Sequence, residues 1–254
     1  MRHGDYATII LVSKMRIRLF FLLEKEQFPL QYRKSIMSFI KKSLQQYNQN
    51  LYDRFYHQKD PIIKPYTFAI FFHEPKFEKT SIKLQDKSFT MTVAIADEEL
   101  GQDFYESFLK QKNSPFSLYC NSMTVKEVYF LPEEKINSNL LNIKFMSPLV
   151  VREHDATTRK EYYYSFERKE FLDTLKRNIR EEIRISSLSS EIVDEFECVP
   201  IQPKRTVVKF YEKQIEVSMG SYQLRGDKVL LKYLYQAGMG SKRSSGFGMF
   251  SIIL

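Results

Sequence analysis

The stretch AGMGSKRSSGFGMF, residues 237–250, carries four of the eight glycines in the chain, arranged as two Gly-x-Gly pairs. Glycine is favoured where the backbone needs a positive φ or approaches a ligand closely. Two cations and three hydroxyls lie between the pairs, and such groups bind phosphate together with backbone amides. A tight turn, the alternative, needs one or two glycines rather than four. The stretch therefore predicts an open phosphate-binding loop with exposed amides, formed by Gly238, Gly240, Ser241, Lys242, Arg243, Ser244, Ser245, Gly246 and Gly248.

The flanks of this stretch predict a helix before the loop and a strand after it. Apolar residues recur at helical spacing over 227–236, and Gly238 follows as a helix stop. Residues 247–254 have the pattern of a strand. A Walker or dinucleotide loop runs in the opposite order, from strand to helix, and no Gly-Lys-Ser/Thr follows these glycines. The order of elements therefore argues against nucleotide binding of either kind.

The pair Gly238-Met239-Gly240 and Gly246-Phe247-Gly248, at the end of the chain and around a Lys-Arg centre, resembles a known signature. It is similar to that of the CRISPR-associated (Cas) endoribonucleases of the RAMP superfamily, which process precursor CRISPR RNA. The resemblance implies an α+β fold with two tandem ferredoxin-like domains side by side and RNA lying across them. It implies CRISPR repeat RNA as the partner and no cofactor. Other CRISPR-associated effector subunits and a homodimer stay open as further partners.

Composition and charge agree with a nucleic-acid partner. The chain has 254 residues, 43% of them hydrophobic and 28% charged, which is typical of a soluble globular protein with room for two domains. A net charge of +8 favours a polyanionic partner, either nucleic acid or an anionic membrane surface. No apolar run approaches the ~18 residues needed to span a bilayer. Cys120 and Cys198 are isolated, so neither a disulfide framework nor a zinc site is indicated, and a cytoplasmic location is expected.

The first half of the chain predicts the ferredoxin-like order β-α-β-β-α-β. Apolar alternation marks the strands, an apolar stripe marks the first helix, and Asp97 is the expected N-cap of the second helix. Residues 1–14 are expected to be a dispensable extension, because the strand pattern begins at Met15. The expected elements are a strand over 15–23, a helix over 32–47, strands over 66–72 and 89–96, a helix after Asp97 and a strand within 116–130.

The second half repeats this order after a polar connection over residues 132–139. We expect domains at residues 1–131 and 139–254, with the candidate catalytic histidine in the first and the glycine-rich loop in the second. The expected elements are a strand within 140–152, a helix over 168–183, hairpin strands over 207–211 and 215–219, a helix from 227 and a final strand.

Catalytic residues are implied by the resemblance alone. It implies a histidine just after the first helix, which matches His57, a tyrosine at the start of that helix, which matches Tyr32, and a lysine, which matches Lys64 or Lys59. A histidine can transfer the proton when the 2′-hydroxyl of RNA attacks the adjacent phosphorus without a metal, and a lysine can stabilise the charged transition state. From the residues alone, His57 is a surface histidine in a polar loop.

Two rival functions stay open. A non-catalytic RNA-binding subunit of the same superfamily shares every fold signal and differs only at His57. A structural or protein-interaction module is disfavoured by the basic charge. His73 and His154 stand apart from any carboxylate cluster, so a metal site is not expected, although the loop of His154 lies next to a basic stretch and is a candidate RNA contact.

Overall fold

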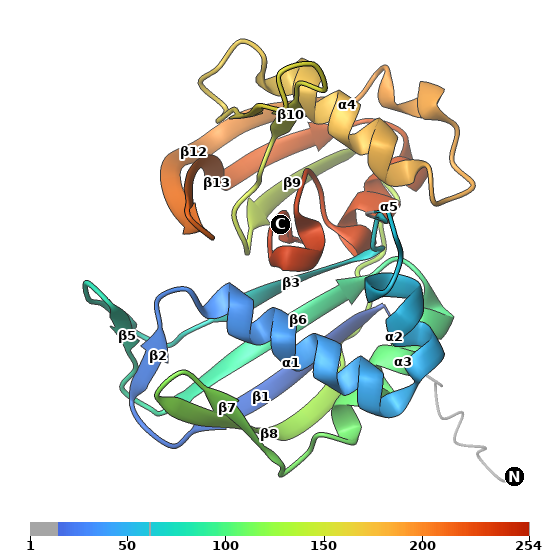
Figure 1. Cartoon of the computed structure of the whole chain (residues 1–254). Helices are drawn as coiled ribbons and strands as arrows, with labels where there is room; N and C mark the ends of the chain where they lie inside the picture. Colours follow the sequence, from blue (N-terminus) through green and yellow to red (C-terminus); the bar gives the residue numbers. More distant parts are fainter. Residues whose placement is uncertain (1–14, 61, 254) are drawn as a thin grey trace, which may run out of the picture.

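The computed structural model describes residues 15–60 and 62–253 of the chain. It consists of two halves, each an antiparallel sheet with helices packed on one face, and the two sheets are formed by separate parts of the sequence (Figure 1). The fold is α+β with two tandem ferredoxin-like units, as expected. The expectation for residues 1–14 lies outside the described residues.

The sheet of the first half has the strand order β3-β6-β1-β8-β7. Its central strand, β1, pairs antiparallel with β6 on one side and with β8 on the other. The order β3-β6-β1-β8 is that of a ferredoxin-like sheet, and β7 extends its edge. The strands are β1 (Arg16–Leu23), β3 (Tyr66–Phe71), β6 (Ser88–Ile95), β7 (Pro115–Leu118) and β8 (Asn121–Phe130).

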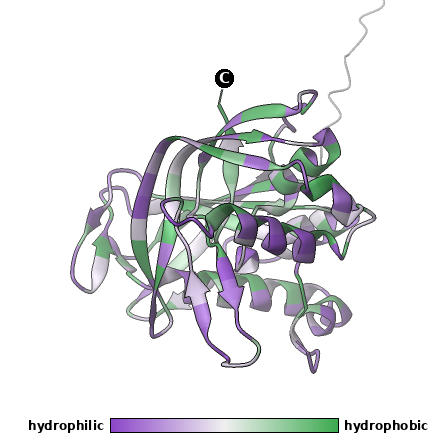
Figure 2. Ribbon diagram, turned by 90° about the horizontal axis from the view of Figure 1, so that it is seen from above, coloured by the Kyte–Doolittle hydropathy of each residue, from purple (hydrophilic) through white to green (hydrophobic). Residues whose placement is uncertain are grey.

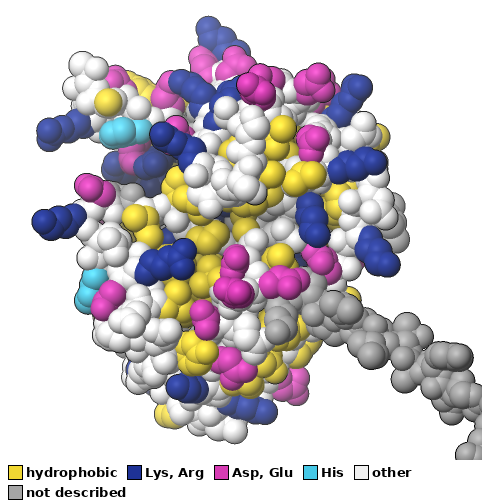
Figure 3. All heavy atoms as spheres, turned by 90° about the vertical axis from the view of Figure 1, so that its right-hand side faces the viewer, with side chains coloured by type: hydrophobic (Ala, Val, Ile, Leu, Met, Phe, Trp, Pro, Cys, Tyr) yellow, Lys and Arg dark blue, Asp and Glu magenta, His cyan; other side chains and the backbone are white. Residues whose placement is uncertain are grey.

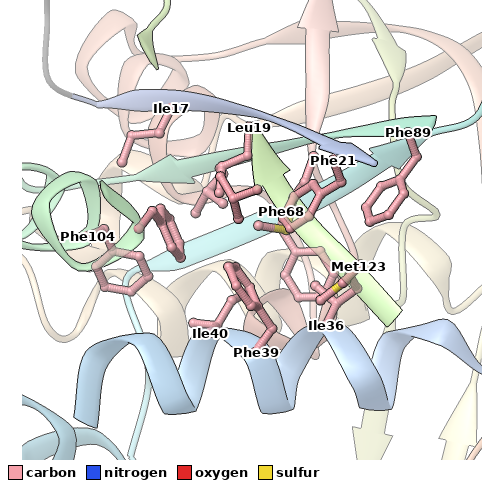
Figure 4. Close-up of a cluster of buried hydrophobic side chains, with 14 of the residues drawn as sticks. Ile17, Leu19, Phe21, Ile36, Phe39, Ile40, Phe68, Phe89, Phe104 and Met123 are labelled. Atoms are coloured by element: carbon pink, nitrogen blue, oxygen red, sulfur yellow. The ribbon is translucent and has the colours of Figure 1, made fainter. Parts of the chain in front are cut away.

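Helices α1 (Tyr32–Tyr47) and α3 (Glu98–Leu109) cover one face of this sheet. Asp97 caps α3 as expected, because its carboxylate accepts a 2.7 Å hydrogen bond from the Leu100 amide. Inward side chains of β1 meet the apolar stripe of α1 (Figure 4). Burying each such side chain stabilises the fold by about 1.5–3 kcal/mol. The residues at this contact are Ile17, Leu19, Phe21, Ile36, Phe39 and Ile40.

Several short elements of the first half were not expected. Residues expected to be a polar loop form helix α2 (Gln49–Tyr56), whose N-terminus is capped by the side chain of Asn48. Its apolar face is only Leu51 and Phe55, too short a repeat to reveal a helix. A small separate sheet has the order β2-β5-β4, with strands β2 (Gln27–Pro29), β4 (Lys76–Phe77) and β5 (Ser81–Lys83).

The second half has the strand order β12-β13-β9-β14, again that of a ferredoxin-like sheet. Two helices lie against its buried face, α4 (Phe171–Ile183) and α5 (Lys228–Ala237). Residues 131–139 between the two sheets belong to no helix or strand, and we keep 1–131 and 139–254 as the proposed domain limits. The strands are β9 (Leu140–Phe145), β12 (Glu197–Phe210), β13 (Lys213–Arg225) and β14 (Phe250–Ile252).

The hairpin of β12 and β13 is much longer than expected and turns at Tyr211 and Glu212. Most of β12 is exposed, so it lacks the buried alternation that marks a strand. Its Pro200 and Pro203 are tolerated because β12 is an edge strand.

A two-stranded ribbon, β10 (Arg152–His154) and β11 (Glu161–Tyr163), projects beside α4 and is hydrophilic along its length (Figure 2). The second half also contains two short 3₁₀ helices, η1 (Ser190–Val193) and η2 (Arg243–Ser245).

Arg16 joins the start of the first sheet to the end of the second. Its buried guanidinium donates hydrogen bonds of 2.6 Å to the carbonyl of Tyr235 and 2.9 Å to that of Phe250. Burial lowers the pKa of Arg16 to about 10. The two halves therefore share buried polar contacts as well as apolar ones.

Candidate nucleic-acid interface

Two glycines of the glycine-rich loop, residues 237–250, lie directly on the first half of the protein. A Cβ at Gly238 would come within 2.7 Å of the Thr67 side chain, and one at Gly246 within 2.5 Å of the Phe68 ring. Both have positive φ, 80° and 82°. These glycines therefore allow strand β3 and the loop to approach one another, which is a packing role.

The other two glycines fit the loop to its own half. A Cβ at Gly240 would meet the carbonyl of Val150, and one at Gly248 would overlap the carbonyl of Met239. The neighbouring amides are used internally: Ser241 donates to the carbonyl of Val150 at 2.7 Å and Gly248 to that of Pro148 at 2.8 Å. The expectation of an open loop with exposed amides is therefore wrong, because contacts distant in sequence explain the glycines.

Arg243, expected to be a free cation of the loop, is 4% exposed. Its guanidinium donates to the carbonyl of Ala237 at 3.2 Å and lies 3.8 Å from the carboxylate of Glu182 on α4. Burial raises the pKa of Glu182 to about 8, although Arg243 acts in the opposite direction. Arg243 is therefore a structural residue that holds the loop against α4.

Lys242, Ser241 and Ser244 face a cavity of about 630 Å³. Its walls are the segment between α2 and β3, the ribbon strand β10, helix α4 and the loop itself. In Figure 1 the segment after α2 rises toward α4 and α5. The Lys64–Lys242 cavity, as we call it, is lined by Ile62, Ile63, Lys64, Arg152, Glu153, His154, Thr174, Arg177, Asn178, Arg180, Glu181, Glu182, Gly240, Ser241, Lys242, Arg243 and Ser244.

Figure 3 shows the side of the molecule on which this junction lies. Apolar side chains form an irregular strip through the middle of this face, and basic side chains lie on both sides of it together with acidic ones. The cavity wall carries six Lys and Arg residues against three Glu residues. An excess of positive charge along a hollow between two domains suits a polyanionic chain.

Most arginines of the cavity are already neutralised by carboxylates. Arg152 lies 2.8 Å from Glu161, and Arg177 lies 2.9 Å from Glu153. Arg180 is paired with Asp194. These ion pairs fix the positions of the arginines in the cavity wall. Lys64 and Lys242 are therefore the cations of the wall whose charge is least neutralised.

Lys64 and Lys242 are held by aromatic rings. The Lys64 ammonium lies 5.1 Å from the ring centroid of Tyr56, and that of Lys242 lies 5.4 Å from that of Phe210. Within residues 15–60 and 62–253, no carboxylate lies within 4.0 Å of either ammonium. Burial lowers the pKa of both lysines, and a like charge lowers it further, from Lys41 for Lys64 and from Arg152 for Lys242, while the carboxylate of Glu161 acts on Lys242 in the opposite direction.

His57 lies at the C-terminal end of α2 and does not line the cavity. Its side chain is 59% exposed, and its Nδ1 lies 2.6 Å from the carboxylate of Asp53, one helical turn earlier. Its ring also contacts Tyr52 edge-on. The pair leaves Nε2 without a partner among the described residues, which is the atom a substrate could meet.

Tyr32 stands apart from the other residues expected in catalysis. It begins α1, and its ring packs against Phe28 and Phe72. Within the described part of the chain, no hydrogen bond, ion pair or ring contact joins Tyr32 to His57 or Lys64. Of the residues expected in catalysis, Lys64 is the one at the cavity, and exposed Lys59 does not line it.

Sequence reasoning missed part of the cavity wall. Arg152, Asn178 and Arg177 come from β10 and α4 and meet the loop only in the folded chain. Asn178 is the connector, since its side chain bonds both main-chain groups of Arg152 and accepts from the Ser241 hydroxyl. The one sequence feature that could have indicated this wall is the run of basic residues on the outer face of α4. Such a run cannot be told from an ordinary solvated surface.

Comparisons with known proteins agree with this architecture. Residues 131–252 match the family model described as CRISPR associated protein Cas6, C-terminal. A CRISPR-associated endoribonuclease-like protein Cas6 from Pyrococcus furiosus is 26% identical over 181 residues, which cover 68% of this chain and 71% of the relative. Within residues 15–60 and 62–253, no helix has the length and apolarity needed to cross a membrane.

Two solved structures share the fold. The first, described as a Cas6-related gene product from Pyrococcus furiosus, has a TM-score of 0.83 and 22% identity, covering 94% of this chain and 98% of that one. The second, described as an RAMP protein binding different RNA substrates, has a TM-score of 0.82 and 18% identity, covering 94% of this chain and 100% of that one. The second half of the chain therefore matches the Cas6 C-terminal family, and the chain as a whole shares the fold of a Cas6-related protein and of an RAMP protein.

Proposed function

We propose that this protein binds CRISPR repeat RNA and cleaves it without a metal ion, generating mature CRISPR RNAs. The observation that carries the proposal is the Lys64–Lys242 cavity, a basic hollow between two ferredoxin-like halves, the second of which matches the Cas6 C-terminal family model. Phosphates dominate protein–nucleic acid affinity, and lysines at the wall of a cleft are suited to track them. CRISPR repeat RNA is the proposed partner because residues 131–252 match the Cas6 C-terminal family model.

In the proposed chemistry the 2′-hydroxyl attacks the adjacent phosphorus, and the 5′-oxygen of the next nucleotide leaves. The products carry a 2′,3′-cyclic phosphate and a 5′-hydroxyl. His57 transfers a proton through Nε2, and Asp53 holds its Nδ1 and so fixes the ring. Lys64, whose ammonium lies over the ring of the residue preceding His57, stabilises the charged phosphorus.

The support for metal independence comes from the side chains that could act as metal ligands. Within the described residues, no group of three or more His, Cys, Asp or Glu side chains is placed to hold a metal ion. A two-metal nuclease needs such carboxylates. The proposed histidine mechanism uses the ribose hydroxyl as nucleophile and needs none.

A non-catalytic RNA-binding RAMP protein is the second candidate. Two observations favour it: His57 lies outside the cavity lining, and one relative is named for binding different RNA substrates. Both candidates predict RNA binding through the same cavity, so only cleavage separates them.

The deciding experiment incubates the full chain with transcripts of CRISPR repeats, with and without EDTA, and maps any product ends. Cleavage at one position that survives EDTA and leaves a cyclic phosphate supports the nuclease. RNA binding without cleavage at any repeat would leave the non-catalytic candidate. A chain that neither cuts nor binds repeat RNA refutes both.

A further inference from the structure

We infer that Lys64 donates the proton to the leaving 5′-oxygen of the cut RNA, and that Lys41 of helix α1 is the positioning residue that fits Lys64 for this step. The inference rests on the proposed cleavage, in which His57 and Lys64 act at one phosphodiester. It adds a proton donor to that reaction and a residue that lies outside the lining of the Lys64–Lys242 cavity.

Lys41 and Lys64 lie over the same aromatic ring, that of Tyr56. The Lys41 ammonium is 4.9 Å from the ring centroid and the Lys64 ammonium is 5.1 Å from it, although the two lysines come from α1 and from the segment after α2. The ring itself is anchored, because the Tyr56 hydroxyl lies 2.7 Å from that of buried Tyr66. One fixed ring therefore holds both ammoniums without neutralising either.

The same ring belongs to an aromatic patch of α2 that ends at His57. The Tyr56 ring lies 5.3 Å from that of Tyr52, which contacts the His57 ring edge-on at 5.0 Å. The Asp53 carboxylate, 2.6 Å from Nδ1 of His57, favours the proton on that nitrogen and so leaves Nε2 with a lone pair. A histidine in this form accepts the proton of the 2′-hydroxyl, so the leaving oxygen needs a separate proton donor.

Lys64 is suited to be that donor because its surroundings disfavour its positive charge. Burial lowers the pKa of its ammonium, and the charge of Lys41 lowers it further. Among residues 15–60 and 62–253, no carboxylate lies within 4.0 Å of either ammonium to offset this. A lysine whose pKa is lowered is a stronger acid, and it releases its proton more readily to a leaving oxygen.

Other charged groups face Lys64 across the cavity, but Lys41 is the one whose charge shifts its pKa. Three arginines of the opposite wall are paired with carboxylates, and Glu182 is buried against Arg243. The remaining distance across the hollow separates Lys64 from these charges. They are Arg152, Glu153 and His154 of β10, Arg177, Arg180 and Glu181 of α4, and Lys242 of the loop.

In the inferred step the 2′-oxygen forms a bond to phosphorus and gives its proton to Nε2 of His57. The bond from phosphorus to the 5′-oxygen breaks, and that oxygen takes a proton from the Lys64 ammonium. The products are a 2′,3′-cyclic phosphate and a 5′-hydroxyl. His57 is left protonated and Lys64 neutral, and proton exchange with water returns both side chains to their starting forms.

The test measures single-turnover cleavage of repeat RNA against pH. The rate should rise with pH as His57 loses its proton and fall at higher pH as Lys64 loses its own, because the base must be neutral and the acid charged. In Lys41→Gln the alkaline limb should move to higher pH, since the like charge that lowers the pKa of Lys64 is gone. Lys41→Arg keeps that charge and should keep the wild-type profile. Lys64→Gln should slow cleavage by ~10² to 10⁴ and lose the alkaline limb.

Lys42→Gln is the matched control. Lys42 is the next residue of α1, is exposed like Lys41, and has its ammonium over an aromatic ring as well, that of Phe116 at 5.4 Å. Both Gln variants remove one surface charge, so both should weaken RNA binding to the same small extent. Only Lys41→Gln should move the alkaline limb. An equal shift in the two variants, or no shift in either, would overturn the role of Lys41.

A second measurement needs no RNA. The pH dependence of Lys64 acetylation by acetic anhydride, followed by peptide mass spectrometry, reports the pKa of Lys64 in the free protein. That pKa should be higher in Lys41→Gln than in wild type and unchanged in Lys42→Gln. A pKa of Lys64 that does not respond to Lys41→Gln contradicts the inference, whatever the protein does to RNA.

The two measurements together separate this inference from the proposed function. If wild type cuts repeat RNA while the alkaline limb stays in place in Lys41→Gln, Lys64 is not the proton donor, and the nuclease stands. If wild type cuts no repeat RNA, the proposed nuclease fails, and the role of Lys64 as proton donor fails with it.

Discussion

The hydroxyl of Thr67 donates a 2.7 Å hydrogen bond to the carbonyl of Phe247, and this buried bond joins strand β3 of the first half to the glycine-rich loop of the second. Beside it, Arg33 of α1 donates to the carbonyl of Gly246 at 3.3 Å and lies over the ring of Phe247. The loop is thus held from both sides by the first half. The relative position of Lys64 and Lys242 depends on these contacts.

Replacing Gly246 with Ala should destabilise the protein by roughly 1–3 kcal/mol, because its left-handed backbone would be strained and a Cβ would meet the Phe68 ring. Denaturant unfolding measures the change. Gly226→Ala is the control, since a Cβ there makes only ordinary contacts, 3.4 Å from Phe196, and no positive φ is involved. If both substitutions changed the free energy of unfolding equally, close packing of Gly246 against β3 would not be the reason for a glycine at this position.

Lys242 and Arg243 are adjacent but should respond oppositely to substitution by Gln. Lys242→Gln should weaken RNA binding and reduce the salt slope by up to ~0.7, with little change in melting temperature. Arg243→Gln should lower stability by about 1–3 kcal/mol, because it removes the donor that satisfies the buried carbonyl of Ala237. Thermal melts and RNA titrations of both variants check this prediction. If Arg243→Gln were stable but bound RNA more weakly, Arg243 would be an RNA-binding residue rather than a structural one.

The buried Glu182 should make stability decrease as pH rises from about 5 to 8. Its folded pKa, raised to about 8, lies above the value of 4.5 taken for a free glutamate, so over this window the folded state binds more protons than the unfolded state. The loss is at most about 1.4 kcal/mol per pH unit. Glu182→Gln mimics the protonated form and should remove the decline. A decline that persists in Glu182→Gln would mean that other groups cause it.

His57→Ala should slow cleavage by ~10² to 10⁴ with little loss of RNA affinity, the usual span for a positioned proton-transfer group. His73→Ala is the matched control, because His73 is also exposed, at 61%, and also contacts a carboxylate, that of Asp86 at 3.1 Å. Single-turnover kinetics on repeat RNA measure both, and a 2′-deoxy nucleotide at the cut site should abolish cleavage. Equal rates for His57→Ala and wild type would remove His57 from the mechanism.

Local signals in the sequence predicted most of the fold. The stripe of Ile36, Ile40 and Leu44 predicted α1 with its observed bounds, and Asp97 predicted the start of α3. These signals act within a few residues, where spacing and capping decide the structure. Helix α2 and the ends of β12 lack them, and there the sequence was not informative.

The candidate site was harder to predict because its residues are assembled by long-range contacts. Gly238 and Gly246 looked like ligand-binding glycines, and only their position on Thr67 and Phe68 reveals a packing role. Arg243 looked like a surface cation because its partner, Glu182, lies on a different helix. No spacing rule connects such pairs, so burial and charge pairing could not be read from the chain.

The hydrogen bonds from Arg16 to the carbonyls of Tyr235 and Phe250 impose an order on folding during synthesis. Phe250 is made 234 residues after Arg16, which at ribosomal speed is a delay of roughly 10–50 s. Throughout that interval the first sheet can form, but the guanidinium of Arg16, at the start of its central strand, lacks its two carbonyl partners. The first half can therefore complete its buried contacts only after Phe250 has emerged from the ribosome.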